Sequence, residues 1–302
     1  MRSHPESRAV TGRDRRASTT VPSMLDPLLL QHCVLTAAQL EQLGLDRTRR
    51  EAALRQGRLL RIRTGWFARP DASPDVVAAV RARACIACVS ALRLRGAWVP
   101  EGAGRPHVRH ARRSDGIRDR EGCRPHGSPP PVTSAIDDLE TAFRCLLRCG
   151  SHEDVVVVAD SLLHRGLASL EELASWMQAA PSRIRALLDQ VDASESGTES
   201  MVRIRLRRRN VRVRTQVWIG RRRVDLLVGD LLVIECDGAE HHAGWTAQSA
   251  DRERDRELVA AGYVVVRLTY RQIVDDWPSV ERDLLAILRR GGHRGPRRAR
   301  CS

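Results

Sequence analysis

The sequence predicts an α/β protein in three parts: a small N-terminal unit of helices and a hairpin, a mostly helical middle region, and a C-terminal α/β sandwich with a mixed sheet. Three observations lead to this prediction. Helix-capping residues and then an alternating segment occur between residues 36 and 68, and apolar residues recur at helical spacing between 133 and 190. Four apolar strand-like runs lie between 211 and 269, and a helical segment before the last run favours a parallel pair in an otherwise antiparallel sheet.

The composition favours a polyanionic partner, most simply nucleic acid. The 302 residues carry a formal net charge of +14, and all 51 basic residues are arginine. Aromatic residues make up only 3%, which argues against a single-strand platform built on base stacking. The first twenty residues lack an apolar signal core, and no apolar run approaches the roughly 20 residues of a membrane span. We therefore expect a cytoplasmic protein with reduced thiols, with DNA as partner and neither a membrane nor a small-molecule substrate.

Residues 1–22 have the polar composition of a flexible tail, and residues 23–70 have the pattern of a winged helix-turn-helix. Thr36 and Gln39 make a capping-box pair, and Gly44 supplies the stop of that helix. An Arg-rich helix is expected from Asp46 to Gln56. The alternating segment that follows turns at Thr64 and Gly65, as a basic wing would.

This N-terminal segment resembles the N-terminal domain of AbiEi-type antitoxins. The resemblance implies that arginines of the second helix and the wing contact DNA phosphates or base edges. They are Arg47, Arg49, Arg50 and Arg55 on the helix, and Arg58, Arg61 and Arg63 on or near the wing. The alternative is a small helical domain whose charged face is merely solvated; recognition of DNA or of a protein partner is favoured over it.

Residues 71–190 are expected to form a mixed and then helical connector. A helix from Asp75 to Leu94 would place Cys85 and Cys88 side by side, and we interpret both as small buried hydrophobes. Four zinc-capable side chains follow at suggestive intervals, but we favour a basic hairpin there because spacing alone often misleads. They are His107, His110, Cys123 and His126.

The rest of this region, from Thr133 to Gln190, has the apolar spacing of a helical bundle. It resembles the helical segment that joins antitoxin-type winged helices to nuclease-like domains. Cys145 and Cys149 are interpreted as core residues. We expect the region to hold the two ends of the chain in a fixed relation.

Acidic residues interrupt two apolar strands between Arg221 and His242. An ionised carboxylate in a core strand is costly unless it is paired or holds a metal. A two-residue turn would put Asp225 and Glu235 on opposite faces, whereas a three-residue loop from Gly229 to Leu231 would pair them directly. We predict the three-residue loop, because only that register brings Asp225, Glu235 and Asp237 to one side.

Several spaced residues of this segment resemble the endonuclease-like domain related to very-short-patch-repair (Vsr) endonucleases, which belongs to the PD-(D/E)XK superfamily. The resemblance covers about residues 195–290. Residues 291–302 are expected to form a basic tail. The matching positions are Asp225, Glu235, Asp237, Gly238, His241, His242, Asp251, Arg252, Arg254, Asp255, Leu258, Gly262 and Arg267. The resemblance implies a restriction-endonuclease-like α/β sandwich. The sequence departs from the pattern at the lysine of the E-x-K motif, where Asp237 stands instead.

The resemblance implies metal-dependent hydrolysis of phosphodiester bonds. Asp225 and Glu235 would hold Mg²⁺ or Mn²⁺, with Asp237 beside them. His241 or His242 is the expected general base or acid, with a solvated loop element as the alternative. Glu199 occupies the place of an acidic residue on the first helix, or else it only complements the helix dipole. Arg254 and Arg267 are expected to reach phosphate.

Three functions remain open from the sequence. The leading one is a metal-dependent DNA endonuclease targeted by its own winged helix. The alternative is a non-catalytic, antitoxin-like transcriptional regulator with a degenerate nuclease fold and a possible protein partner; the missing lysine favours it. Charge and site chemistry also leave an RNA-directed nuclease open.

Overall fold

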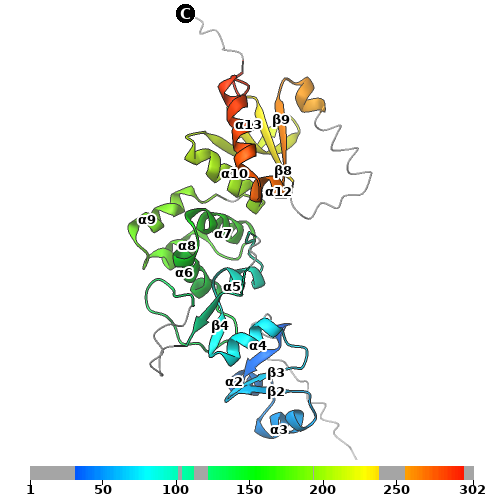
Figure 1. Ribbon diagram of the computed structural model, residues 1–302, viewed down its shortest axis with the longest axis vertical. Helices are drawn as coiled ribbons and strands as arrows, with labels where there is room; N and C mark the ends of the chain where they lie inside the picture. Colours follow the sequence, from blue (N-terminus) through cyan, green and yellow to red (C-terminus); the bar gives the residue numbers. More distant parts are fainter. Residues whose placement is uncertain (1–30, 101–103, 112–121, 193, 238–255, 296–302) are drawn as a thin grey trace, which may run out of the picture.

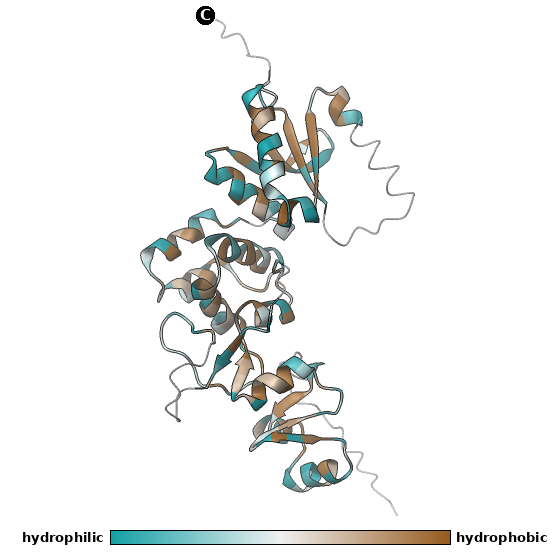
Figure 2. Cartoon of the chain, viewed as in Figure 1, coloured by the Kyte–Doolittle hydropathy of each residue, from teal (hydrophilic) through white to brown (hydrophobic). Residues whose placement is uncertain are grey.

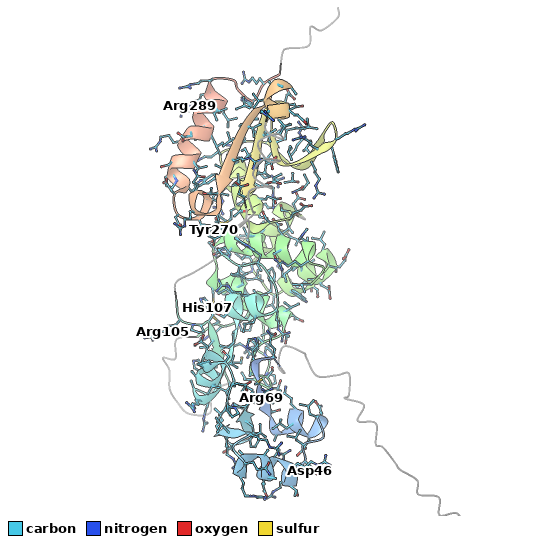
Figure 3. The ribbon with its side chains drawn as sticks, turned by 90° about the vertical axis from the view of Figure 1, so that its right-hand side faces the viewer. Asp46, Arg69, Arg105, His107, Tyr270 and Arg289 are labelled. Carbon is cyan, nitrogen blue, oxygen red and sulfur yellow. The ribbon has the colours of Figure 1, made fainter. Side chains whose placement is uncertain are left out.

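A computed structural model describes residues 31–100, 104–111, 122–192, 194–237 and 256–295, and three parts of the chain follow one another along the long axis (Figure 1). Asp46, at the start of an N-terminal helix, lies near one end, and Arg289, at the end of the last helix, lies near the other (Figure 3). Every helix within these ranges is too short or too polar to traverse a bilayer.

The described residues of the N-terminal part include two short helices and a three-stranded antiparallel sheet of order β1-β3-β2. Its elements are β1 Val34–Thr36, α2 Ala37–Gln42, α3 Arg47–Arg55, β2 Leu60–Arg63 and β3 Trp66–Ala68. The predicted capping box is confirmed, since Gln39 N donates to Thr36 Oγ1 at 3.2 Å and Thr36 N donates to Gln39 Oε1 at 2.8 Å. One side of its sheet packs in a small core made of Leu35, Leu40, Ala53, Leu59 and Phe67. The other side joins the main core of the protein through Val34, Trp66 and Ala68.

The middle part begins differently from its prediction. The single helix expected from Asp75 to Leu94 is instead two helices around a strand: α4 Pro74–Arg81, β4 Ala84–Ile86 and α5 Cys88–Leu94. Left-handed backbone at Arg83 (φ 57°) and Cys88 (φ 50°) interrupts the helix on either side of β4. β4 pairs with β5, Val108–His110, and all three β4 residues are buried.

The basic hairpin predicted for residues 107–126 is also wrong in part. β5 exists, but its partner is β4, and residues 123–126 form no strand. Cys123 N instead donates one hydrogen bond to Val108 O at 2.7 Å. Helices then follow as predicted: α6 Leu139–Cys149, α7 His152–His164, α8 Leu170–Met177, α9 Ser182–Arg185 and a 3₁₀ turn at Ala186–Gln190.

The C-terminal part is a four-stranded mixed sheet of order β6-β7-β8-β9 with helices against it. Its elements are α10 Gly197–Arg208, β6 Val213–Ile219, β7 Arg222–Val228, β8 Leu232–Asp237, β9 Val264–Thr269, α12 Tyr270–Val274 and α13 Trp277–Arg289. The first three strands are antiparallel, and β8 and β9 are parallel, as predicted. The helix expected from Gln248 to Ala261 begins outside the described residues, and residues 256–260 are helical.

One continuous hydrophobic core joins the middle and C-terminal parts. It includes Phe143 of α6, Val157 of α7, Ile204 of α10 and Ile234 of β8. Figure 2 shows the central strands of the C-terminal sheet as largely hydrophobic, with hydrophilic turns on the flanking helices. The C-terminal sheet therefore rests on the helical region through α10, which packs against α7.

Candidate active site at the acidic strands

The register between β7 and β8 is the one predicted from the acidic residues. Leu226 lies opposite Ile234, Leu227 opposite Val233 and Val228 opposite Leu232. One further step along this register places Asp225 opposite Glu235. The connecting loop is residues 229–231, as the prediction required.

Gly229 makes this short loop feasible. Its φ is +61°, in the left-handed region that favours glycine. A Cβ at this position would lie 2.3 Å from the carbonyl oxygen of His293, which accepts a hydrogen bond from Asp230 N at 2.8 Å. The chain after α13 thus holds the loop in place, and a larger residue at 229 would displace it.

A row of polar side chains crosses the sheet at the level of Asp225. Thr215 pairs with Leu226 and Val217 with Val224, so Gln216 of β6 lies opposite Asp225. Glu235 pairs with Arg267 of β9 in the parallel register. Gln216, Asp225, Glu235 and Arg267 therefore occupy one level on four adjacent strands.

The third acidic residue, Asp237, lies two positions beyond Glu235 and shares its face by strand alternation. Its Oδ1 is 3.9 Å from Nη1 of Arg267. Both side chains are partly exposed, at 43% and 31%. Cys236, between the two acidic residues, is buried in the main core, as predicted.

Glu199 reaches the site from the first turn of α10. It is 4% exposed, and its Oε2 accepts a hydrogen bond from Gln216 Nε2 at 2.7 Å. Its backbone N–H donates to Ser196 Oγ, the N-cap of the helix, at 3.2 Å. Burial and the nearby charge of Asp225 raise the pKa of Glu199 to about 7. A glutamate that only complements the helix dipole does not need burial, whereas this side chain is buried beside Asp225.

The side chain of Asp225 interacts with that of Glu235 through a hydrogen bond. Burial is the main cause that raises the pKa of Asp225, and the charge of Asp237 adds to it, whereas the hydrogen bond with Glu235 lowers this pKa. Cys236 N also donates to Asp225 Oδ2 at 2.8 Å. Clustered carboxyl oxygens fit a hard divalent cation, because its charge offsets the repulsion between neighbouring carboxylates.

Gln216 is the member of this site that the sequence analysis missed. It is an amide in an otherwise ordinary amphipathic strand, and its left-handed backbone (φ 51°) has no signature in the sequence. Its position becomes visible only when β6 is paired with β7.

Three of the predicted site residues lie outside the described residues: His241, His242 and Arg254. So do Gly238, Asp251, Arg252 and Asp255 of the motif. β8 ends at Asp237, so the two histidines follow the acidic strand directly in sequence.

The N-terminal arginines divide into exposed and internal ones. Arg47, Arg49 and Arg61 are exposed. Arg50 is 8% exposed, and its Nη1 donates to Glu41 Oε1 at 2.9 Å and to Leu45 O at 2.9 Å, so the expectation that it faces phosphate is wrong. Arg63 is half-buried: its Nε donates to Val80 O at 2.9 Å, and its guanidinium lies over the Trp66 ring.

Comparison with known proteins supports the C-terminal part of this description. Residues 199–288 match the family model REase_MTES_1575, a restriction-endonuclease family. The matched segment begins at Glu199 and contains all four strands of the mixed sheet. No curated protein and no solved structure matches the chain. The C-terminal part of this chain is therefore similar to a restriction-endonuclease family, and this similarity suggests a nuclease.

Proposed function

We propose that the protein is a metal-dependent DNA endonuclease whose N-terminal winged helix-turn-helix positions it on DNA. The observation that carries the proposal is the register of β7 and β8, which brings the side chains of Asp225 and Glu235 together, with Glu199 and Asp237 close by. These residues lie within the segment that matches a restriction-endonuclease family. The finer resemblance to the Vsr-like subtype is part of this proposal.

Asp225 and Glu235 would hold Mg²⁺ or Mn²⁺ through their facing carboxylates. When bound, such an ion polarises the phosphodiester and lowers the pKa of a coordinated water. Gln216 fixes Glu199 by its hydrogen bond, and Glu199 and Asp237 add negative charge around the ion. His241 or His242 would exchange the proton of the attacking water or the leaving oxygen, and Arg254 and Arg267 would contact phosphate.

The N-terminal part supports the targeting half of the proposal. α2 and α3 are joined by a short turn, and β2 and β3 form a hairpin beside them. Exposed arginines lie on α3 (Arg47, Arg49) and on the hairpin (Arg61). Contacts of these residues with phosphates would make DNA affinity fall as salt rises, because bound counterions are released. The AbiEi-like assignment is likewise a proposal.

Cleavage of supercoiled plasmid in the presence of Mg²⁺ or Mn²⁺ tests the catalytic half. Asp225→Asn and Glu235→Gln should each abolish nicking and leave DNA affinity unchanged. Asp283→Asn is a matched control, since it removes an exposed carboxylate from α13 of the same domain. Retained cleavage in both site variants would refute the proposed active site. Duplex, mismatched and single-stranded DNA and RNA, compared side by side, identify the substrate class.

A non-catalytic regulator is the second candidate, because Asp237 occupies the place of the E-x-K lysine. Metal binding separates the two functions without relying on activity. A catalytic site predicts that Mg²⁺ or Mn²⁺ raises the melting temperature of the wild-type protein and not that of the Asp225→Asn variant. DNA binding without cleavage, together with no such thermal shift, would support the regulator.

A further inference from the structure

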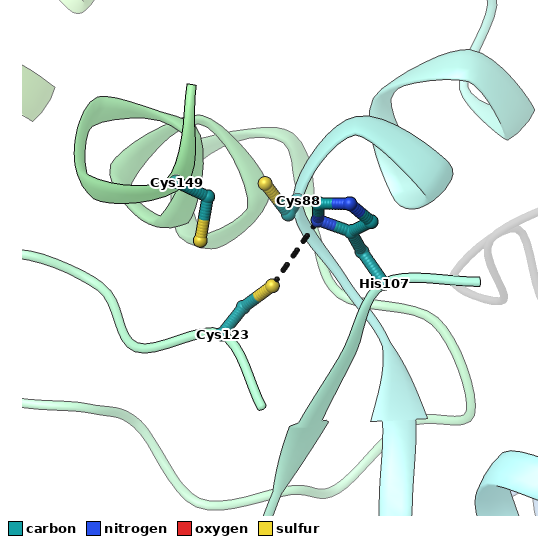
Figure 4. A group of neighbouring side chains, drawn as sticks. All are labelled: Cys88, His107, Cys123 and Cys149. Atoms are coloured by element: carbon teal, nitrogen blue, oxygen red, sulfur yellow. Dashed lines mark hydrogen bonds between the residues drawn. The ribbon is translucent and has the colours of Figure 1, made fainter. Parts of the chain in front are cut away.

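Four metal-ligating side chains meet in the middle part of the chain, well away in sequence from the acidic strands. They are Cys88, His107, Cys123 and Cys149, and one ligand atom from each lies within 4.8 Å of every other. Figure 4 shows the three sulfur atoms and the imidazole ring turned toward one another. Cys88 and Cys123 are buried, His107 is half-buried and Cys149 is exposed.

We propose that these four side chains form a structural zinc site of the Cys₃His type. Zinc in structural sites is tetrahedral, with Zn–S near 2.3 Å and Zn–N near 2.0–2.1 Å. Those lengths imply ligand separations of about 3.8 Å between two sulfurs and about 3.6 Å between sulfur and nitrogen. Cys123 Sγ lies 3.4 Å from His107 Nδ1, close to the tetrahedral edge. The whole group is compact enough to close on one ion with small movements.

The backbone around the group is already fixed. Ala87 N donates to His107 O at 2.8 Å, and Cys123 N donates to Val108 O at 2.7 Å. His107 N donates to Ser90 Oγ at 2.9 Å. These bonds bring the start of α5, the residue before β5 and the segment after residue 122 together independently of any metal.

Cys88 adopts a backbone conformation that a non-glycine residue rarely takes. Its φ is +50°, at the first residue of α5. Such a conformation costs of the order of 1 kcal/mol or more and persists where the surroundings require it. Here it directs a buried thiol toward His107, Cys123 and Cys149, which simple core packing would not require.

The other buried cysteines of this region show the contrast. Cys85 Sγ donates to Asp137 Oδ1 at 3.2 Å and has no place in the group of four. Cys145 precedes Cys149 by one turn of α6 and is fully buried, yet it too lies outside the group. Cys149 is exposed and so is not the core residue it was predicted to be, whereas Cys88 is buried in the main core as predicted and also belongs to the group of four. A disulfide would join only two of the three clustered thiols and would leave the third beside the imidazole.

Only two of the four residues that the sequence spacing suggested belong to this site. His107 and Cys123 are in it, whereas His110 and His126 are not. His110 Nδ1 is buried without a hydrogen-bond partner within the described ranges, and the backbone of His126 is bound to Arg144. The true partners come from α5 and the end of α6, which are distant in sequence and carry no finger-like spacing.

A zinc ion here would tie α5, the β5 segment and the C-terminal end of α6 to one point. α6 belongs to the core on which the C-terminal domain rests. The site would thus have a structural role, since all four coordination positions are taken by protein side chains and none is left for a substrate. This inference is independent of the proposed nuclease activity.

The test is the metal content of the full-length protein, purified with zinc supplied and without chelator. Elemental analysis should find one zinc per chain. The Asp225→Asn/Glu235→Gln double variant should contain the same amount of zinc, because it changes only the acidic site. Cys88→Ser and Cys149→Ser should each lose it. Cys145→Ala is the matched cysteine control on α6, and His110→Gln and His126→Gln are the histidine controls; all three should keep zinc.

Replacing zinc with Co²⁺ in the wild-type protein tests the site without any variant, so a cysteine variant that fails to fold does not affect this result. Co²⁺ bound by three thiolates and an imidazole should give thiolate charge-transfer bands and strong tetrahedral d–d bands. Wild-type protein with free thiols and no stoichiometric zinc, or with two of the three thiols in a disulfide, would overturn the proposal. If the histidine variants lose zinc while Cys88→Ser and Cys149→Ser keep it, the ligand assignment would be overturned.

Discussion

Replacing Asp160 with asparagine should weaken the attachment of the C-terminal domain to the helical region. Asp160 lies on α7 and Arg203 on α10, and they form an ion pair that is 1% and 0% exposed. Asp160 also accepts hydrogen bonds from Ser200 Oγ at 2.6 Å and from Asp192 N at 2.7 Å. Arg203 Nη1 donates to Gln190 O at 2.6 Å. The pair thus connects two helices from different parts of the chain.

The expected cost follows from the burial of the charge. Asp160 accepts from Asp192 N through Oδ1 and from Ser200 Oγ and Arg203 through Oδ2. The single carbonyl oxygen of an asparagine can replace only one of these acceptors, and the guanidinium of Arg203 would be left without a counter-charge in the core. Removing one partner of a buried pair costs about 3–5 kcal/mol, which is the loss expected for this variant. Replacing both residues, by Asp160→Asn with Arg203→Met, removes the orphaned charge. The double variant should therefore be more stable than Asp160→Asn alone.

Urea denaturation of the wild type, the two single variants and the double variant gives this comparison as a double-mutant cycle. Amide hydrogen exchange should show the loss of protection in α7 and α10. Glu281→Gln is the control, because it breaks the exposed pair with Arg209 and should cost less than about 1 kcal/mol. An Asp160→Asn variant as stable as this control, or a double variant whose loss equals the sum of the singles, would refute the reasoning.

Two further predictions concern the titration of the acidic site and the DNA-binding surface. Without Mg²⁺, the pKa of Glu199 in the folded protein is about 7, above its ordinary value of 4.5. Protonation of Glu199 therefore adds to the free energy of unfolding. This contribution is complete below pH 4.5 and is lost as the pH rises to about 7. Glu199→Gln should then melt higher than the wild type above pH 7, and a difference that does not shrink below pH 4.5 would contradict this. Arg47→Ala with Arg61→Ala should weaken DNA binding and reduce its salt dependence. Arg50→Ala should lower the melting temperature instead, because Arg50 holds Glu41 and Leu45; unchanged stability would contradict its internal role.

Much of the C-terminal sheet was predictable because local and chemical signals agreed. Apolar runs set the strands, and the cost of burying carboxylates set the register, since only one loop length brings Asp225 and Glu235 together. The capping box at Thr36 was predictable for a similar reason: its two hydrogen bonds depend on residues three apart.

What failed depended on contacts between distant segments. The residues of β4 have helical spacing with α4 and α5, and only pairing with β5 makes them a strand. Arg50 resembles its exposed neighbours on α3 in sequence, and its burial arises from packing against α2. The spacing of Cys88 and Cys149 in the sequence does not indicate a shared metal site, because only the fold brings these two residues together.

Arg267 is a candidate for the positive charge that the missing lysine of the E-x-K motif would supply. It lies on β9 opposite Glu235, and its guanidinium is 3.9 Å from Asp237, the residue in the lysine place. A positive charge from the neighbouring strand thus stands near the position where the motif usually supplies one. Unlike lysine, a guanidinium stays protonated at any working pH, so Arg267 would stabilise developing negative charge and leave proton transfer to another group.

This interpretation predicts a specific pattern in the kinetics of two variants, provided that the domain cleaves DNA. Arg267→Met should lower the cleavage rate constant by about 10²–10³-fold, the usual loss for a group that stabilises transition-state charge. Arg267→Lys should recover part of that rate, because it restores charge but not the planar geometry. DNA affinity and the thermal shift with Mg²⁺ should change little in either variant. A loss confined to DNA affinity would make Arg267 a binding residue only, and an equal loss in Arg267→Lys and Arg267→Met would show that charge alone does not explain its place beside Asp237.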